Sequence, residues 1–344
     1  MASMKFPTKC LLFFPLILTI LASLQNYSSQ AQTPTLNPYD FLHIIPNPDG
    51  SITRPKEFFP TVPPNTSSPL TFSKDVPLNP NKKPWVRVYL PKYSKPVNDL
   101  PIVVFAHGGG FVVQSTASPP LDSFLSNTAS QLAALVVSVE FRLAPEHRLP
   151  AAYDDVLEAL FWVKEKKDEW VSKYGDVSRC VIMGESSGGN IVYNVGLRAS
   201  DLVRELEPLI IRGLVLIQPF FGGVNPITTG VAGNLEIVFD LLWNLSLPLG
   251  APLNNPYFNP MFGGGSSNLE KIKNLGWRVA FAGCDGDFMI DRQVEVFKFF
   301  KKRKLDVVGD FCKGYYHGVF IGDPTQAQKL YDFVRNVFSS YMRY

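Results

Sequence analysis

The sequence predicts an α/β protein with a mostly parallel central sheet covered by helices on both faces. Short runs of β-branched and aliphatic residues alternate with longer helical patterns, and hydrophobic residues make up 46% of the 344 residues. Strand–helix–strand alternation at this spacing builds parallel sheets. A composition this apolar can bury a large core, which excludes a chain that is disordered throughout.

The predicted elements begin near residue 85 and continue to the C-terminal region. Short β-rich runs, expected to form strands, lie at 85–90, 101–106, 134–141, 179–184, 211–218, 277–283 and 305–311. Helical patterns lie at 153–173, 188–200, 290–303 and 325–341. Length and periodicity separate the two kinds of run.

Two segments do not fit this alternation. Residues 33–84 are rich in Pro, Asn and Ser, and the insertion 219–274 places helix-like residues 235–245 between loops rich in Gly, Pro and Asn. Long insertions at one end of such a sheet usually form lids. We therefore expect both segments to contribute to a cap over the sheet.

Residues 1–31 have the form of a secretory signal peptide. Lys5 and Lys9 precede an apolar run at 11–24, and small residues follow this run as they do at a cleavage site. A retained anchor helix is the disfavoured alternative, because the run is short for a membrane span and contains Pro15.

The leader predicts a mature single domain at 32–344 without a stable membrane span. It also predicts that this domain lies in the secretory pathway, in the ER lumen, the vacuole or the apoplast. Asn65 and Asn244 begin Asn-X-Ser/Thr sequons and are candidate glycosylation sites. Three cysteines remain after the leader, so at most one disulfide forms and its pairing stays open: Cys180, Cys284 and Cys312.

The charge pattern excludes one class of partner. The formal net charge of +3 at pH 7 is spread thinly along the chain, so no nucleic-acid partner is expected. No CxxC run or Cys/His spacing indicates a metal site. The sequence therefore predicts neither a metal nor a cofactor, and it leaves the oligomeric state open.

A serine at a sharp turn is the strongest functional signal in the chain. The run Gly184-Glu185-Ser186-Ser187-Gly188 matches G-x-S-x-G and stands between a predicted strand and a predicted helix. In that setting the turn holds the middle serine in a strained conformation, and the flanking glycines let strand and helix crowd together. Ser186 is therefore the candidate nucleophile of an acyl-transfer site.

A glycine-rich loop upstream supplies a second candidate feature. His107 is followed by Gly108, Gly109 and Gly110 directly after a predicted strand. Glycines let backbone N–H groups approach a ligand closely. Together with the N–H of Ser187 they would bind the oxyanion of acyl transfer. A flexible turn is the plain alternative.

The order of residues along the chain selects the catalytic base and reduces the number of candidates for the catalytic acid. In this architecture the triad order is Ser, then Asp or Glu, then His. Of the four histidines, only His317 follows Ser186. The acid is expected after the penultimate strand, where Asp285, Asp287 and Asp291 lie. Asp291 is expected to cap or open the next helix, and spacing leaves the other two open.

These motifs resemble those of the plant carboxylesterases, the hormone-sensitive-lipase-like branch of the α/β-hydrolases, to which gibberellin receptors and carboxylesterase-like cyclases are related. The matching stretches span nearly all of 40–340 and include HGGGF (107–111), VEFRLAPEHRLPAAYDD (139–155), GESSGGN (184–190), GCDGDFMIDRQ (283–293) and YYHGVF (315–320). The resemblance implies an α/β-hydrolase fold with a triad of Ser186, Asp287 and His317. It also implies that the oxyanion donors are the glycines after His107 and Ser187.

The chain departs from the family pattern near the expected pocket. The family commonly has Asp and Ala where this chain has Glu185 and Ser187, and Phe288 replaces a proline beside the acid. Because phenylalanine leaves the backbone freer than proline does, we expect the acid to be less firmly held. The segment 222–259 lacks the family's usual Arg-Thr-x-Ser-Glu and Arg-Asp-His-Pro runs.

Three functions are compatible with the resemblance. It implies first a serine carboxylesterase that hydrolyses a carboxylic ester of a small plant metabolite. The alternative is a carboxylesterase-like cyclase or lyase that uses the same triad on an alkaloid-like substrate. The altered 222–288 region leaves this alternative open, because a fold does not determine the reaction. A gibberellin-receptor-like binding protein is third, and His317 argues against it because those receptors lack this histidine.

Overall fold

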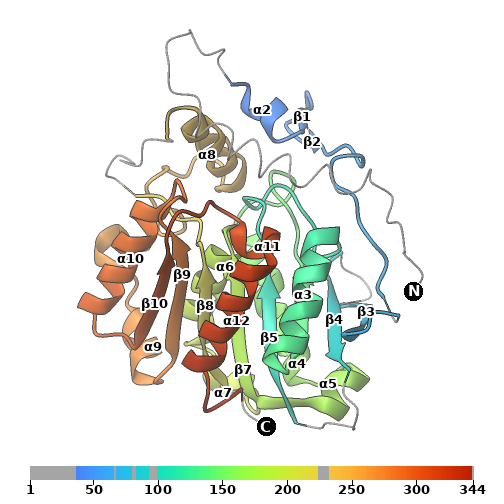
Figure 1. Ribbon diagram of the computed structural model, residues 1–344. Helices are drawn as coiled ribbons and strands as arrows, with labels where there is room; N and C mark the ends of the chain where they lie inside the picture. Colours follow the sequence, from blue (N-terminus) through green and yellow to red (C-terminus); the bar gives the residue numbers. More distant parts are fainter. Residues whose placement is uncertain (1–35, 66, 80–82, 93–98, 224–231, 343–344) are drawn as a thin grey trace.

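The computed structural model describes residues 36–65, 67–79, 83–92, 99–223 and 232–342, and the predicted leader lies outside them. Within this part of the chain, an eight-stranded sheet of order β10-β9-β8-β7-β5-β6-β4-β3 forms the centre (Figure 1). In chain order its strands are β3 (Thr71–Pro77), β4 (Trp85–Pro91), β5 (Leu100–Ala106), β6 (Leu135–Glu140), β7 (Gly175–Glu185), β8 (Ile211–Ile217), β9 (Arg278–Cys284) and β10 (Val307–Cys312). Two short strands, β1 (Ile45–Pro46) and β2 (Ile52–Thr53), pair with each other.

The sheet is mostly parallel, as the sequence predicts. Strands β5 to β10 run parallel to one another, and β4 is antiparallel to both β6 and β3. Every run predicted as a strand forms one. The edge strand β3 is not predicted, because its buried positions include Thr71 and Ser73, which do not produce an apolar alternation in the sequence.

Helices connect the strands and cover both faces of the sheet. In chain order they are α2 (Pro38–Phe41), α3 (Pro119–Leu132), α4 (Ala151–Lys164), α5 (Glu169–Tyr174), α6 (Ser187–Ala199), α7 (Val203–Leu206), α8 (Ala232–Ser246), the 3₁₀ turn η1 (Phe262–Gly264), α9 (Asn268–Asn274), α10 (Ile290–Lys302), α11 (Val319–Gly322) and α12 (Pro324–Val337). Of the helices described, none is both long and apolar enough to cross a bilayer.

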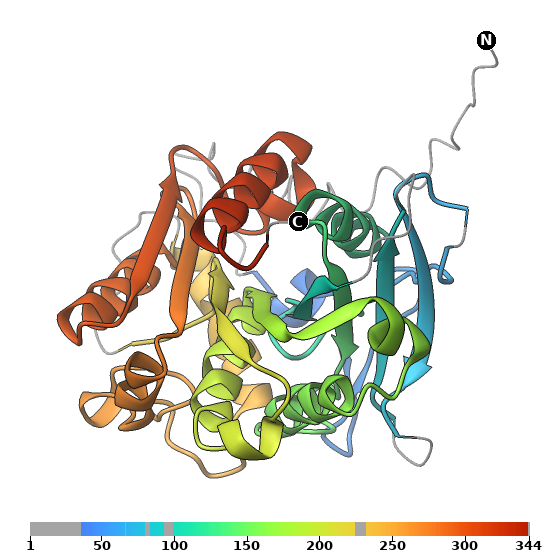
Figure 2. The same cartoon turned by 90° about the horizontal axis from the view of Figure 1, so that it is seen from below.

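The core has two layers, one on each face of the sheet. Helices α3, α11 and α12 lie on one face, and α4, α6 and α10 lie on the other (Figure 2). Because successive strand residues point to opposite faces, Val103 and Phe105 of β5 join the first layer while Ile102 and Val104 join the second. These fully buried strands explain the continuous apolar runs in the sequence.

Two predicted helices have different bounds in the structure. The pattern at 153–173 is divided into α4 and α5, with Lys166 in a left-handed conformation (φ 49°) between them. The Asp168 side chain accepts the N–H of Trp170 and begins α5. Helix α12 ends at Val337 rather than at residue 341. Helix α3 is not predicted, although it begins with prolines, which suit a first helical turn.

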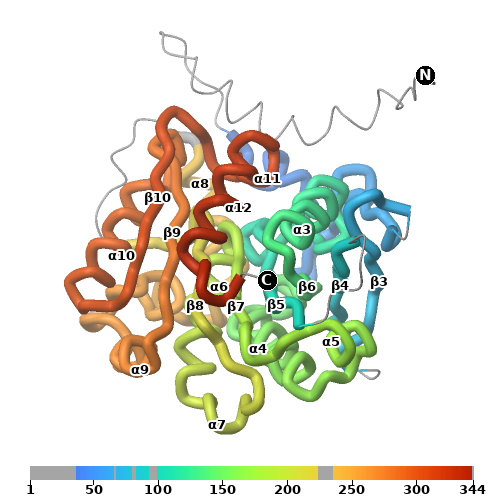
Figure 3. Tube along the Cα trace, turned by 60° about the horizontal axis from the view of Figure 1, so that its bottom comes forward, coloured from blue at the N-terminus to red at the C-terminus, as the bar shows by residue number. Residues whose placement is uncertain are grey.

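The predicted cap covers the C-terminal ends of the parallel strands. Helices α8 and α2 contact each other there, above the sheet (Figure 1). One part of the cap prediction is wrong. Residues 268–274 of the insertion form α9, which packs against α6 and lies, with α7, at the end of the sheet opposite α8 (Figures 1 and 3). This helix precedes β9 and belongs to the body of the fold.

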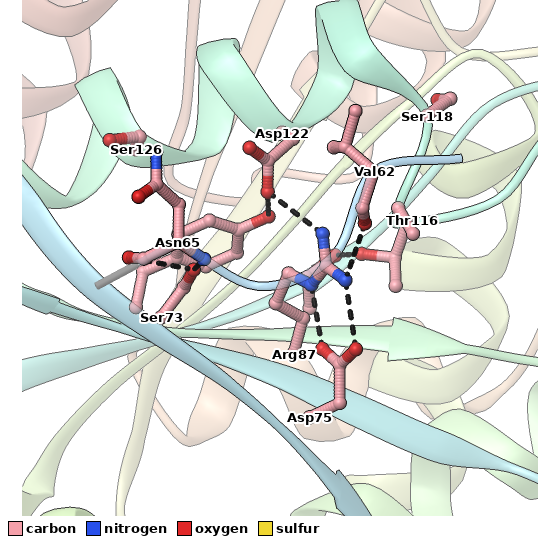
Figure 4. Close-up of polar contacts among 12 residues, drawn as sticks. Val62, Asn65, Ser73, Asp75, Arg87, Thr116, Ser118, Asp122 and Ser126 are labelled. Carbon is pink, nitrogen blue, oxygen red and sulfur yellow. Dashed lines mark hydrogen bonds and ion pairs between the residues drawn. The ribbon is translucent and has the colours of Figure 1, made fainter. Parts of the chain in front are cut away.

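An ionic cluster around the buried Arg87 joins the N-terminal segment to the β3–β4 edge. The Arg87 side chain is 1% exposed and donates to both carboxylate oxygens of Asp75, to Oδ1 of Asp122 and to the carbonyl oxygen of Val62 (Figure 4). Tyr89 Oη also donates to Asp122. The guanidinium is therefore paired on all sides, which compensates for its removal from water.

Candidate active site

Ser186 occupies a sharp turn between β7 and α6. Its backbone has φ 55° and ψ −120°, a region that is costly for a residue with a Cβ. A Cβ on Gly184 would clash with the Gly188 carbonyl, and one on Gly188 would clash with the carbonyl of Ala106. The glycines of the motif therefore allow the backbone crowding that the sequence analysis expects, and the turn holds Ser186 at the C-terminal end of the sheet.

The predicted base and acid lie in line with this serine. His317 Nε2 is 2.9 Å from Ser186 Oγ, and His317 Nδ1 is 2.8 Å from Asp287 Oδ2. Both separations are hydrogen-bond distances. The three side chains come from the ends of β7, β9 and β10, far apart in the sequence. The structure thus brings together the three residues that the resemblance selects.

Asp285 and Asp287 have different environments, which spacing alone does not reveal. Asp287 is fully buried, and its carboxylate accepts hydrogen bonds from the side chains of Gln218 and Gln293 and from the N–H of Met289. Asp285 is exposed and accepts the N–H of Gly314. Of the two, Asp287 is the one that contacts His317.

The expectation that Phe288 loosens the acid is not met. Asp287 has three hydrogen-bond donors besides His317, so its carboxylate is held independently of the residue that follows it. The Phe288 ring lies edge-on to the imidazole of His317, with ring centroids 5.7 Å apart. Phenylalanine therefore forms part of the wall around the base.

A disulfide crosses between the two strands that lead to the acid and the base. Cys284 and Cys312 are paired residues at the ends of β9 and β10, and they are joined covalently. Asp285 N–H also donates to the Cys312 carbonyl. Cys180 is a buried free thiol. The arrangement of one bridge and one free cysteine agrees with the count made from the sequence.

The glycine loop turns its backbone toward the nucleophile. Gly109 and Gly110 have φ of 94° and 62°, and both line the cavity that contains Ser186. Gly108 does not line it and lies against Glu185, whose carboxylate a Cβ would meet. In the described part of the chain, no acceptor is recorded for the N–H groups of Gly109, Gly110 and Ser187. These three donors are thus available to a ligand.

An apolar cavity of about 170 Å³ opens above Ser186. Its walls come from the cap, the glycine loop and the base loop, and they comprise Phe41, Leu42, Gly109, Gly110, Val113, Gln114, Glu185, Ser186, Phe220, Leu235, Val238, Phe239, Leu242, Phe288, His317, Gly318 and Ile321. Leu242 of α8 packs directly on Gly110, where it occupies the space of a side chain. The cap therefore forms the cavity roof and contacts the oxyanion loop.

The pKa values of the ionisable groups around the serine are shifted by burial and by their neighbours. Burial alone would lower the pKa of His317, but the charge and hydrogen bond of Asp287, with the charge of Glu185, raise it overall. Burial raises the pKa of Glu185 to about 7. His107, stacked on Phe141, has its pKa lowered to about 4 by burial and is therefore neutral near pH 7.

Three residues of the site are missing from the sequence prediction. Gln218 donates to both Asp287 and the Tyr316 carbonyl and accepts the N–H of Gly318, so it joins the acid loop to the base loop. Gln293 is the other amide partner of Asp287. A glutamine in an ordinary helix or strand end carries no sequence signal of this role. Glu185 lies in the G-x-S-x-G motif, but the sequence indicates only that it differs from the family's usual Asp and predicts no role for it.

The described residues contain no group of three or more His, Cys, Asp or Glu side chains placed to hold a metal ion. The sequence predicts neither metal nor cofactor, and that expectation remains a prediction.

Comparison with known proteins identifies the family. Residues 103–321 match the family model described as alpha/beta hydrolase fold. The chain is 45% identical over 323 residues to Carboxylesterase 20 of Arabidopsis thaliana, with 90% of this chain and 98% of the relative covered. It is 37% identical to 3-O-acetylpapaveroxine carboxylesterase CXE1 of Papaver somniferum, with 87% of this chain and 98% of the relative covered.

Solved structures of esterases share the fold. An esterase from Pyrobaculum calidifontis has a TM-score of 0.64 at 24% identity, covering 80% of this chain and 88% of the other. A thermostable esterase from Pseudomonas putida has a TM-score of 0.70 at 17% identity, covering 95% and 97%. The relatives from Arabidopsis and poppy are similar to this chain in sequence over nearly their whole length. The chain therefore belongs to the plant carboxylesterase family of α/β-hydrolases, carboxylic ester hydrolases of the serine type.

Proposed function

We propose that the protein hydrolyses a carboxylic ester of a small plant metabolite through an acyl-enzyme on Ser186. The observation that carries this proposal is the continuous hydrogen-bonded chain from Ser186 through His317 to the buried Asp287, with distances of 2.9 and 2.8 Å, at the base of an apolar cavity. A serine hydroxyl needs a base in this position to become a nucleophile.

Acylation uses the three side chains in sequence. His317 Nε2 takes the proton of Ser186 Oγ as the oxygen forms a bond to the ester carbonyl carbon. The resulting oxyanion accepts hydrogen bonds from the N–H groups of Gly109, Gly110 and Ser187. The imidazolium then gives its proton to the alkoxy oxygen, the carbon–oxygen bond of the ester breaks, and the alcohol leaves.

Deacylation repeats these steps with water. His317 takes a proton from the water molecule as the water oxygen attacks the acyl carbon. The same N–H groups bind the second oxyanion, and Ser186 recovers its proton as the carboxylic acid leaves. Asp287 keeps the imidazole in the tautomer with the proton on Nδ1. The amide hydrogen bonds from Gln218 and Gln293 to Asp287 support this role, because they fix the carboxylate in its buried position.

The cavity favours a compact, largely apolar group next to the ester. Phe220, Phe239 and Leu242 line it, and about 170 Å³ accommodates a short acyl chain or one ring rather than a long lipid tail. The name of the poppy relative describes an ester of 3-O-acetyl type. A short-chain acyl ester of a plant metabolite is therefore the substrate class we propose.

Ester hydrolysis by the purified protein tests this function. We expect p-nitrophenyl acetate or butyrate to be hydrolysed and a fluorophosphonate probe to label Ser186, as located by peptide mass spectrometry. A folded protein that neither hydrolyses these esters nor reacts with the probe would contradict the proposal. Release of a cyclised or eliminated product without alcohol and acid, from an alkaloid-like precursor, would support the cyclase or lyase alternative.

We also propose that the mature chain starts near Gln32 and enters the secretory pathway. The form of the leader supports this. So do the disulfide, which needs an oxidising compartment, and the exposure of Asn65 and Asn244. N-terminal sequencing and intact mass of the protein from plant tissue test it, with sugar expected on Asn65. A full-length, unglycosylated cytosolic product would overturn it.

A further inference from the structure

Glu185 is a buried carboxyl group that the proposed mechanism does not use. It is the last residue of β7, is 5% exposed and lines the cavity beside Ser186. Its Oε1 lies 3.8 Å from His317 Nε2. No described residue donates a hydrogen bond to this carboxyl group. A buried carboxyl group without a donor is costly, so its retention beside the base calls for a physical reason.

The two carboxyl groups near His317 face opposite sides of its ring. Asp287 is hydrogen-bonded to Nδ1, and Glu185 approaches Nε2. Nε2 is the atom that receives the proton of Ser186, so positive charge appears on the ring when the oxyanion forms. At this separation and away from bulk water, the attraction between a carboxylate and an imidazolium is substantial.

We propose that Glu185 is a positioning residue that stabilises the imidazolium form of His317 from its Nε2 side during acyl transfer. This inference rests on the proposed function. The ring is neutral before the serine attacks and charged afterwards, so Glu185 favours the transition state over the free enzyme. Gly108 makes the arrangement possible, because any side chain there would occupy the space of the Glu185 carboxylate.

The ionisation of the two groups is consistent with this geometry. Burial raises the pKa of Glu185 to about 7; the charge of His317 opposes that rise and the charge of Asp287 adds to it. Asp287 and Glu185 are the charged groups that raise the pKa of His317 against the effect of burial. Each of the two groups therefore shifts the pKa of the other in the direction that favours the ion pair.

The pH dependence of Glu185→Gln tests the inference. Glutamine keeps the shape and removes the charge, so we expect kcat to fall about tenfold with KM little changed, because the lost interaction exists only in the transition state. Without Glu185, the protonated form of His317 loses a favourable charge. The rise of kcat/KM with pH, which requires neutral His317, should therefore move to lower pH.

Two further variants make the comparison specific. Glu185→Asp keeps the charge at a greater distance and should restore part of kcat and part of the pH shift. Glu140→Gln is the matched control, because burial also raises the pKa of Glu140 to about 7. Glu140 accepts hydrogen bonds from Ser115 Oγ and the Thr116 N–H rather than facing His317, so its variant should leave the pH profile unmoved.

A titration without substrate separates this inference from the proposed function. In a Ser186→Ala background, the imidazole NMR signals of His317 should titrate at lower pH when Glu185→Gln is added. An unchanged titration and unchanged kcat would overturn the inference, as would a raised KM with kcat unchanged, which indicates substrate binding by Glu185. A shifted titration in a protein whose wild type hydrolyses no ester would support the Glu185–His317 coupling and overturn the proposed function.

Discussion

The cluster around Arg87 and the group around His317 each contain a buried charged side chain, and they differ in how completely that side chain is paired. Arg87 contacts Asp75, Asp122 and the Val62 carbonyl, so each of its three guanidinium nitrogens has an acceptor (Figure 4). Among the described residues, Glu185 has no hydrogen-bond donor, and its charged partner is the His317 ring, 3.8 Å away. Full pairing locks a structure in one arrangement, whereas an incompletely paired charge responds to a proton that arrives nearby.

The same contrast appears between the two carboxyl groups of the site itself. Asp287 is hydrogen-bonded by Gln218, Gln293 and the Met289 N–H, and in this respect it resembles Asp75 at the sheet edge. Glu185 lines the cavity without such donors. The active site thus combines a rigid acid with a responsive one. The predictions below test this division, beginning with the nucleophile that the rigid acid serves.

Replacement of Ser186 should have the largest effect. Ser186→Ala removes the nucleophile and should lower kcat by about 10⁶-fold, the scale known for removal of a triad serine. Ser187→Ala is the matched comparison: its hydroxyl is buried without a partner in the described part of the chain, and its N–H remains. Rates on p-nitrophenyl butyrate check both variants. A large loss only in Ser187→Ala, with probe labelling moved to Ser187, would sink the assignment.

Asp287→Asn should rank second, at about 10⁴-fold in kcat, because the amide favours the wrong tautomer of His317. Asp285→Asn should cost far less, since Asp285 is exposed and bonds to a loop N–H instead of to the base. Side-by-side kcat values for the two folded variants measure the difference. If their order is reversed, Asp285 is the acid in the working enzyme.

The sequence predicts the parts of the molecule that depend on local pattern and chain order. The parallel strands, the Ser186 turn and the base His317 follow from apolar runs, glycine spacing and the order of the triad. The choice of Asp287 over Asp285 depends on Gln218 and Gln293, which approach it from β8 and α10, and no local pattern encodes that convergence. The strand β3 is hidden for a related reason: Thr71 and Ser73 are buried against polar partners, the Ser126 hydroxyl and the Asn65 backbone, which come from other segments of the chain.

Replacement of Arg87 should affect stability rather than chemistry. Arg87→Met leaves Asp75 and Asp122 without their cation. Because these two side chains are 35% and 18% exposed, water partly replaces the lost partner, and the cost should lie near the lower end of the roughly 3–5 kcal/mol of unfolding free energy that breaking a buried pair costs. Urea denaturation measures this loss, with kcat per folded molecule expected to stay near the wild-type value. Lys167→Met, which breaks an exposed pair with Glu165, should cost less than about 1 kcal/mol. Equal costs would show that the cluster contributes no more than a surface pair.

Removal of the disulfide should cost stability within the range expected for Arg87→Met, and it should also lower kcat slightly. Cys284→Ala with Cys312→Ala opens a cross-link over 28 residues, which corresponds to about 3.6 kcal/mol of lost stability in the chain-entropy account. The register of β9 and β10 persists through their backbone hydrogen bonds, so the loops that carry Asp287 and His317 should stay close and kcat should fall only a few-fold.

Cys180→Ala is the control, because it removes a buried sulfur without opening a cross-link. Urea midpoints and kcat of the double variant, compared with those of the control, measure the effect. A double variant as stable as Cys180→Ala would contradict a stabilising cross-link, and a loss of kcat as large as that of Asp287→Asn would show that the covalent bond, rather than the hydrogen-bonded acid, holds the catalytic geometry.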